Sequence, residues 1–304
     1  MKALLIPILC LFTSSFSYAN EQQIVREESR IVFPENYAQK KEWPLVVLLH
    51  AYKVGGGFQE AYFGLGSQIK KEGFVLLVPG STKDSKGQRF WNATDYCCNH
   101  FDSPVDDVSY LHDLILKTKS LYKIDPQRVY LIGHSNGAFM AQRLMCDYSE
   151  LFSAVVSLSG AGTRLDSQCA LKSPVSFLEI HSLNDAIVPY AGMNEDTLRE
   201  RLKKKPLYPY ANDPLKVRYA STPDHFRFIA QKNGCDPGSL THEAPKKYAH
   251  FTFEKETEPL HFTRCKNQTE TALWTLKKGG HVPLLNHRFR SAMLEFLFSH
   301  KKVD

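Results

Sequence analysis

Ser135 lies between two glycines in the stretch IGHSNGAFMAQRL, and these residue types at this spacing could do nucleophilic chemistry. The apolar run RVYLI leads into the stretch, and apolar residues at helical spacing follow the serine. Gly-x-Ser-x-Gly at a strand-to-helix junction is typical of a serine nucleophile on a sharp turn, where glycines avoid collisions with the backbone. An ordinary Ser-Gly turn is the alternative. Because both the buried strand and the amphipathic helix are predicted, we interpret Ser135 as a nucleophile.

A serine hydroxyl is a weak nucleophile and needs a histidine base, which in turn needs a carboxylate to orient it. After a turn of this type the expected chain order is serine, acid, histidine. Asp185 fits the acid, because it follows the apolar run VSFLEI in the loop SLNDAIVPY. His281 fits the base, because a glycine pair separates it from a predicted strand in TALWTLKKGGHVP. A histidine on the surface or in the core, without a catalytic role, is the alternative for His281.

Acyl transfer also requires N–H donors that stabilise the developing oxyanion. The backbone N–H of Asn136 is the first candidate, because this residue follows the nucleophile. The loop LLHAYKVGGG supplies the second, with Tyr52 as the favoured backbone donor and Ala51 as the alternative; a plain glycine-rich turn is the other interpretation. Trp91 and Tyr96 are candidates for lining a substrate pocket, although aromatic residues at such positions also serve packing.

The elements that must position these residues follow from apolar runs that alternate with helical stretches. The runs lie at 45–49, 74–78, 129–132, 154–158 and 175–180. Near-continuous apolar sequence is expected for parallel strands buried on both faces. The pattern predicts an α/β fold with a doubly wound, mostly parallel sheet and helices on both faces. Further strands are predicted at 249–253 and 271–276, a helix start at Asp106 and Asp107, and a terminal helix at 289–298.

The first 19 residues have the composition of a secretory signal peptide: a basic residue, a short apolar stretch and small residues before the expected cleavage site. The apolar stretch is too short to span a bilayer, so we expect no membrane association after its removal. Residues 20–304 are predicted to form a single catalytic domain. The irregular region at about 191–224 is too long for an ordinary connection and is interpreted as an insertion or lid.

Seven cysteines occur, and Cys10 lies in the predicted signal peptide. The even number that remains favours disulfides in an exported protein. These six residues are Cys97, Cys98, Cys146, Cys169, Cys235 and Cys265. The sequence leaves their pairing open, and Cys235 with Cys265 is the most local pair. No spacing typical of a zinc site occurs, so no metal and no cofactor are predicted. The net charge is +6, and the basic residues are scattered along the chain apart from the run RERLKKK. No nucleic-acid partner is therefore predicted.

Six motifs occur in one order from about residue 40 onward: LLHAY, FWNATDYCCN, VDDVSYL, RVYLIGHSNGAFMAQRLMC, HSLNDAIVPY and LWTLKKGGH. In this series the chain resembles secreted esterases of the polyhydroxybutyrate depolymerase and feruloyl or acetylxylan esterase group, which have the α/β-hydrolase fold. The resemblance implies a triad of Ser135, Asp185 and His281. It also implies a disulfide pattern near the serine that involves Cys97, Cys98 and Cys146. The chain departs from the family at Ala51, where a glycine is usual.

The sequence therefore predicts a secreted serine esterase that acts through an acyl-enzyme. Its expected substrates are hydroxybutyrate oligomers or polyester, or feruloyl and acetyl esters of polysaccharides. An α/β-hydrolase peptidase with the same triad is one alternative, and a non-catalytic secreted binding protein on the same scaffold is another. The same triad would serve each ester, so the sequence leaves the substrate open, together with the choice between periplasm and extracellular space.

Overall fold

The computed structural model describes residues 26–94, 97–162, 169–194, 196–197, 219–248 and 255–303. The predicted signal peptide, Tyr96 and the strand predicted at 249–253 lie outside the described residues. So does most of the predicted insertion at 191–224.

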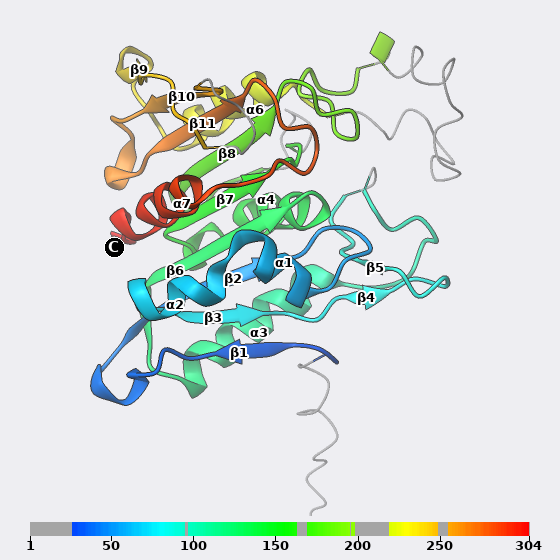
Figure 1. Ribbon diagram of the computed structural model, residues 1–304, viewed down its shortest axis with the longest axis vertical. Helices are drawn as coiled ribbons and strands as arrows, with labels where there is room; N and C mark the ends of the chain where they lie inside the picture. Colours follow the sequence, from blue (N-terminus) through cyan, green and yellow to red (C-terminus); the bar gives the residue numbers. More distant parts are fainter. Residues whose placement is uncertain are drawn as a thin grey trace, which may run out of the picture.

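A nine-stranded sheet with the order β1-β3-β2-β6-β7-β8-β11-β10-β9 runs through the molecule (Figure 1). Its strands are β1 (Arg30–Val32), β2 (Trp43–Leu49), β3 (Val75–Val78), β6 (Ile124–His134), β7 (Ala154–Leu158), β8 (Ser176–Ser182), β9 (Leu240–His242), β10 (Thr257–Phe262) and β11 (Thr271–Leu276). In the middle of this order, the neighbouring strands β3, β2, β6, β7, β8 and β11 are parallel. The antiparallel pairings lie at the edges of the sheet. A separate hairpin pairs β4 (Thr82–Lys83) with β5 (Arg89–Phe90). The mostly parallel sheet confirms the predicted fold class.

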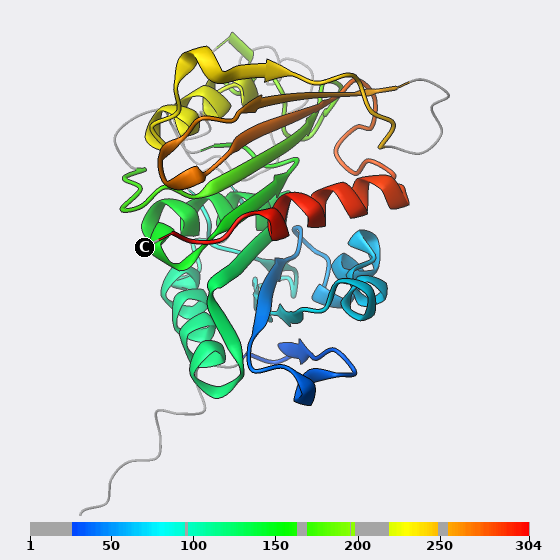
Figure 2. The same cartoon turned by 90° about the vertical axis from the view of Figure 1, so that its left-hand side faces the viewer.

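Helices cover both faces of this sheet (Figures 1 and 2). One face carries α1 (Gly56–Phe63), α2 (Leu65–Glu72) and α7 (His287–Ser299), and the other carries α3 (Asp107–Leu121), α4 (Asn136–Asp147) and α6 (Thr222–Lys232). Short 3₁₀ turns lie at Tyr37–Gln39, Ser149–Leu151, Pro237–Ser239 and Lys266–Gln268. Because alternate side chains of each parallel strand enter opposite cores, both faces of the strand are buried, which explains the continuous apolar runs.

Side-chain caps fix where α3, α6 and α7 begin. The Asp106 carboxylate accepts hydrogen bonds from the N–H and the hydroxyl of Ser109, at 3.0 and 2.6 Å, so α3 begins where the sequence predicts. Ser221 caps α6 in the same way, and Asn286 caps α7 by accepting from Phe289 N at 3.0 Å. The cap at Ser221 precedes Thr222, the first residue of α6, whose N–H donates to Tyr190 O in the loop that follows β8.

Three disulfides join the six predicted cysteines: Cys97–Cys98, Cys146–Cys169 and Cys235–Cys265. The most local pairing expected from the sequence, Cys235 with Cys265, is confirmed. The three cysteines that the resemblance groups near the serine all form disulfides: Cys97 and Cys98 pair with each other, and Cys146 bridges the end of α4 to Cys169. No helix among the described residues is long and apolar enough to cross a membrane.

Candidate active site

Ser135 occupies a sharp turn between β6 and α4. Its φ of 52° lies in the region that side-chain-bearing residues rarely adopt. The Ser135 N–H donates to Leu158 O at 2.9 Å, which ties the turn to the end of β7. This is the strained strand-to-helix turn predicted from the Gly-x-Ser-x-Gly pattern, and it places the hydroxyl at the carboxyl edge of the parallel strands.

The two glycines around Ser135 are required by backbone contacts. A Cβ at Gly133 would lie 2.2 Å from Gly137 O, and a Cβ at Gly137 would lie 2.3 Å from Leu49 O. Both contacts are with main-chain atoms, which cannot swing away as a flexible side chain can. The close approach of α4 to β2 and β6 therefore depends on hydrogen at these positions.

Gly137→Ala is expected to lower the free energy of unfolding by about 3 kcal/mol or more, because the added methyl group forces apart α4 and β2. Chemical denaturation of the purified variant measures the loss. Gly57→Ala is the matched control: a methyl group on this helical glycine would meet only Arg30 Nη2, at 3.8 Å, so stability should be unchanged or slightly higher. Equal stability of the two variants would contradict the packing account.

Ser135, His281 and Asp185 lie in one hydrogen-bonded chain. His281 Nε2 is 2.8 Å from Ser135 Oγ, and His281 Nδ1 is 2.8 Å from Asp185 Oδ2. When Nδ1–H donates to the carboxylate, Nε2 presents its lone pair to the serine hydroxyl, as a general base must. The structure thus brings together three side chains that the sequence separates by 146 and 96 positions.

Asp185 is held as an anion in a buried position. Its side chain has no exposed surface, and Oδ1 accepts from the N–H groups of Ile187 and Val188 at 2.8 and 2.9 Å. Burial alone would raise the pKa of Asp185, but hydrogen bonds and charge interactions with His181 and His281 hold the pKa well below its usual value. Asp185 therefore stays ionised at any pH at which the protein is expected to work.

The loop that carries His281 is fastened by α1 and by the residue before Ser135. His134 Nε2 lies 3.2 Å from His281 O, and His134 Nδ1 lies 3.2 Å from Gln59 Nε2. The Tyr62 hydroxyl donates to Pro283 O at 2.7 Å. Sequence reasoning missed all three supports, since only the position of His134 next to the predicted nucleophile could have signalled one of them.

The candidate oxyanion donors come from the start of α4 and from the loop that follows β2. Asn136 is the first residue of α4, and the N–H groups at the start of a helix have no acceptor within the helix. Ala51 is the alternative for the second donor. Its N–H donates to Gln59 Oε1 at 3.0 Å and is therefore already engaged. Tyr52 follows it, and its hydroxyl donates to Gln88 Oε1 at 2.7 Å. The Tyr52 backbone N–H as the second donor stays a prediction.

Trp91 connects the two donor segments and does not face an open pocket. Its side chain is fully buried, and Nε1–H donates to His50 O at 3.0 Å. Its main-chain N–H donates to Asn136 Oδ1 at 2.7 Å, and its carbonyl accepts from Asn136 Nδ2 at 2.9 Å. Trp91 therefore supports the loops around Ser135, whereas the sequence suggested that it lines a substrate pocket. Tyr96, the other pocket candidate, is outside the described residues.

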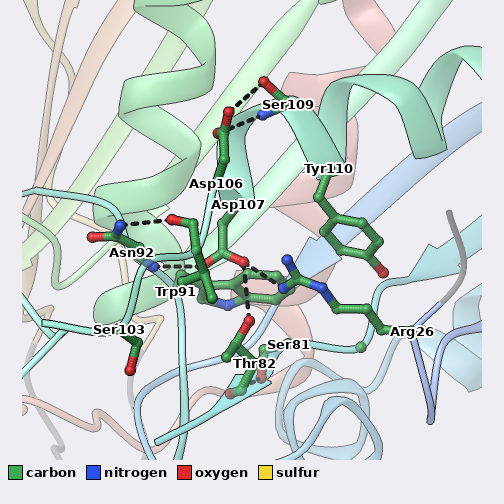
Figure 3. Close-up of polar contacts among 12 residues, drawn as sticks. Arg26, Ser81, Thr82, Trp91, Asn92, Ser103, Asp106, Asp107, Ser109 and Tyr110 are labelled. Atoms are coloured by element: carbon green, nitrogen blue, oxygen red, sulfur yellow. Dashed lines mark hydrogen bonds and ion pairs between the residues drawn. The ribbon is translucent and has the colours of Figure 1, made fainter. Parts of the chain in front are cut away.

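Asp107 anchors the segment that follows Trp91 (Figure 3). One of its oxygens accepts from Asn92 N–H at 2.6 Å, and the other pairs with Arg26. The Asp107 side chain has no exposed surface, and Thr82 Oγ1 lies 3.4 Å from it. The sequence marked Asp107 only as a helix start; its ionic contact with Arg26 joins residues 81 positions apart and gives no local signal.

Two buried histidines near Ser135 resist protonation. Burial lowers the pKa of His134 from 6.5 to about 4, and burial likewise lowers the pKa of His50 to about 4. In the unfolded chain both would titrate near 6.5. Between pH 6.5 and 4 the unfolded state therefore binds protons that the folded state does not, and folding stability must fall as the pH is lowered through this range.

We expect the free energy of unfolding to drop by about 2 kcal/mol per histidine between pH 7 and pH 4.5. Urea denaturation at a series of pH values measures the slope. His134→Gln should remove its share of the slope, whereas His287→Gln, at an exposed position at the start of α7, should leave the slope as it is. A slope that His134→Gln does not change would contradict the assignment of His134 as a buried neutral group.

Comparison with known proteins shows that the chain is similar to esterases. A bifunctional acetylxylan esterase/xylanase, XynS20E, of Neocallimastix patriciarum is 25% identical over 57% of the chain and 23% of its own length. Feruloyl esterase B of Neurospora crassa is 28% identical over 47% of the chain and 47% of its own length. The chain thus spans less than half the length of these curated relatives.

A solved structure and a family model extend the comparison. The acetyl xylan esterase from Aspergillus awamori superposes with a TM-score of 0.59 at 16% identity, over 89% of this chain and 93% of the other, and so shares the fold. The family model described as "Esterase PHB depolymerase" matches residues 30–187, just over half of the chain, including the turn at Ser135 and Asp185. The resemblance seen in the sequence motifs is confirmed: the chain belongs to the Esterase PHB depolymerase family.

Proposed function

We propose that this protein is a serine carboxylic-ester hydrolase in which Ser135 is the nucleophile, His281 the general base and Asp185 the residue that orients the base. The observation that carries the proposal is the continuous chain of two 2.8 Å hydrogen-bond contacts from Ser135 Oγ through His281 to Asp185 Oδ2. It forms at the carboxyl edge of the sheet, in a member of an esterase family.

In the first half of the reaction, Ser135 Oγ attacks the ester carbonyl carbon while its proton moves to His281 Nε2. The backbone N–H groups of Asn136 and Tyr52 are proposed to stabilise the oxyanion of the tetrahedral intermediate. Collapse of the intermediate breaks the bond to the alcohol oxygen, which takes the proton from His281. The acyl group is then bonded to Ser135, and the alcohol leaves.

In the second half, water attacks the acyl-enzyme. His281 accepts a proton from the water, and the second tetrahedral intermediate then collapses to the carboxylic acid while His281 returns the proton to the departing Ser135 Oγ. The ionised Asp185 stabilises the imidazolium that forms in each half, because its low pKa keeps the carboxylate charged. These steps use protein groups and water alone.

For the substrate, we propose hydroxybutyrate oligomers or polyester, or feruloyl and acetyl esters of polysaccharides. The family description and the names of the relatives support these classes. We further propose that residues 1–19 direct export and that residues 20–304 form one catalytic domain with an insertion at about 191–224. The disulfides among the described residues support export, because such bonds persist in oxidising compartments.

A substrate panel tests the proposed activity. Protein lacking residues 1–19 is assayed on p-nitrophenyl acetate, butyrate and octanoate, methyl ferulate, acetylated xylan, soluble hydroxybutyrate oligomers and a p-nitroanilide peptide, with Ser135→Ala as the blank. Turnover of one or more esters that disappears in the variant supports the proposal and ranks the substrate classes. Cleavage of the peptide alone would establish a peptidase, and turnover of none would favour a binding protein.

A further inference from the structure

His181 lies behind the proposed catalytic acid. It belongs to β8, four residues before Asp185, and is 1% exposed. Its Nε2 lies 2.8 Å from Val188 O and 3.2 Å from Asp185 Oδ2. Both neighbours can only accept a hydrogen bond, so Nε2 must carry a proton. His181 therefore closes the loop from Asp185 to Val188 and faces the same carboxylate oxygen that His281 binds.

Thr222 holds the other nitrogen of this ring. Thr222 Oγ1 lies 2.9 Å from His181 Nδ1, and Thr222 is 3% exposed. Its backbone N–H donates to Tyr190 O at 2.9 Å, so the start of α6 is fastened to the far end of the same loop. In a neutral imidazole with a proton on Nε2, Nδ1 is an acceptor, and the Thr222 hydroxyl is the donor that matches it.

We propose that His181 and Thr222 are positioning residues of the triad: the acceptors Val188 O and Asp185 Oδ2 hold His181 as the neutral Nε2–H tautomer, Thr222 fixes the orientation of its ring, and His181 fixes the carboxylate of Asp185 toward His281. The proposal rests on the proposed function for its kinetic consequences. Its structural content, the tautomer of a buried histidine, does not depend on activity. The proposed chain of contacts then runs from Thr222 through His181, Asp185 and His281 to Ser135.

Asp185 Oδ2 lies near both imidazole rings, His181 through its Nε2 and His281 through its Nδ1, so a change at His181 affects the contact with His281. Without the Thr222 hydroxyl, Nδ1 of His181 loses its donor and the ring can turn, which weakens the contacts of its Nε2–H with Asp185 Oδ2 and Val188 O. The carboxylate is then less well oriented, which lowers kcat. With a weaker hydrogen bond from His181, the carboxylate of Asp185 stabilises the imidazolium of His281 more strongly. The acidic limb of the kcat/KM profile therefore moves to higher pH.

The ionisable groups whose rings contact His181 and His281 stay neutral in the range of the assay, and a buried pair, Glu179 with His225 at 3.0 Å, lies on the same strand and helix as His181 and Thr222. The ring of Tyr190 packs 5.7 Å from His181, and burial raises the pKa of its hydroxyl. The ring of His134 lies 5.8 Å from His281, and burial lowers its pKa to about 4. Because the wild type and both Thr222 variants share these groups, an acidic limb that is displaced in Thr222→Val but not in Thr222→Ser reports on His281 and its partners.

The kinetic test compares Thr222→Val, Thr222→Ser and the wild type on the best ester of the panel. Thr222→Val is expected to lower kcat about tenfold with KM within about twofold, and to move the acidic limb upward. Thr222→Ser keeps the hydroxyl and is expected to keep kcat within about twofold and the wild-type pH profile. Equal kinetics and equal pH profiles for Thr222→Val and the wild type would overturn the proposal.

Imidazole ¹⁵N NMR of the unmodified protein provides the second test, with the His181 signals assigned by their loss in His181→Gln. The proposal predicts a neutral ring protonated on Nε2 at pH 7, and a changed Nδ1 chemical shift in Thr222→Val, where Nδ1 has lost its hydrogen-bond donor. A ring protonated on Nδ1, or on both nitrogens, would overturn it. The NMR result stands even if no ester is hydrolysed, in which case the proposed function fails and only the tautomer assignment is judged.

Discussion

Ser135→Ala is expected to lower kcat for ester hydrolysis by five to six orders of magnitude, roughly the effect of removing the nucleophile from a serine hydrolase. The reason is that the hydroxyl forms the covalent bond to the acyl group, and no other described side chain lies in the same contact with His281 Nε2. Steady-state hydrolysis of the best p-nitrophenyl ester measures the loss. KM should change little, because the rest of the site is intact.

The same experiment shows whether Ser135 and His281 act as a unit. His281→Ala alone should cost about as much as Ser135→Ala, and the double variant should be no slower than either single variant. Ser67→Ala, at an exposed helical position, controls for the loss of a serine and should retain full turnover. If kcat of the double variant were far below that of either single variant, so that the two losses multiplied, a shared catalytic step would be contradicted.

Asp185→Asn is expected to lower kcat by about four orders of magnitude while the protein stays folded. An amide of the same shape presents an N–H group or a neutral oxygen to His281 Nδ1, so the imidazole is no longer held as the Nδ1–H tautomer and its positive charge is not stabilised. The loss is measured by kcat across pH 5 to 9, together with thermal unfolding.

Asp147→Asn is the matched control for this change. Asp147 ends α4 and contacts Arg143 at 3.5 Å, with more than a third of its side chain exposed. An ion pair of this kind contributes little, so kcat and stability should both stay near wild type. If Asp185→Asn retained more than about a tenth of the activity, Asp185 would not be the orienting acid and another carboxylate would have to be sought.

The parallel strands and the positions of Ser135, Asp185 and His281 could be predicted because each has a local signature. Burial on both faces makes a strand continuously apolar, and the turn at Ser135 requires glycines at fixed offsets. β10 was missed because Glu258 and Pro259 interrupt its apolar pattern. The fold tolerates Pro259 there, since its carbonyl still accepts from Glu243 N at 3.1 Å.

The supports of the site could not be predicted, because they join residues far apart in sequence through single contacts. Gln59 and His134 are 75 positions apart, and Thr222 and His181 are 41 apart. Nothing in the neighbourhood of Thr222 distinguishes its hydroxyl from that of any other residue at a helix start. Trp91 was assigned to a pocket because an aromatic residue near a predicted site suggests substrate contact, whereas its burial depends on how two loops meet.

Labelling with a fluorophosphonate, followed by intact-mass and peptide analysis, tests the central claim most directly. Such a reagent forms a phosphonyl bond only with a serine that a neighbouring base activates. The account predicts one adduct per chain on the peptide that contains Ser135, and none in Ser135→Ala or His281→Ala. Absence of an adduct on the folded wild-type protein, or an adduct on a different serine, would contradict the assignment of Ser135 as the nucleophile.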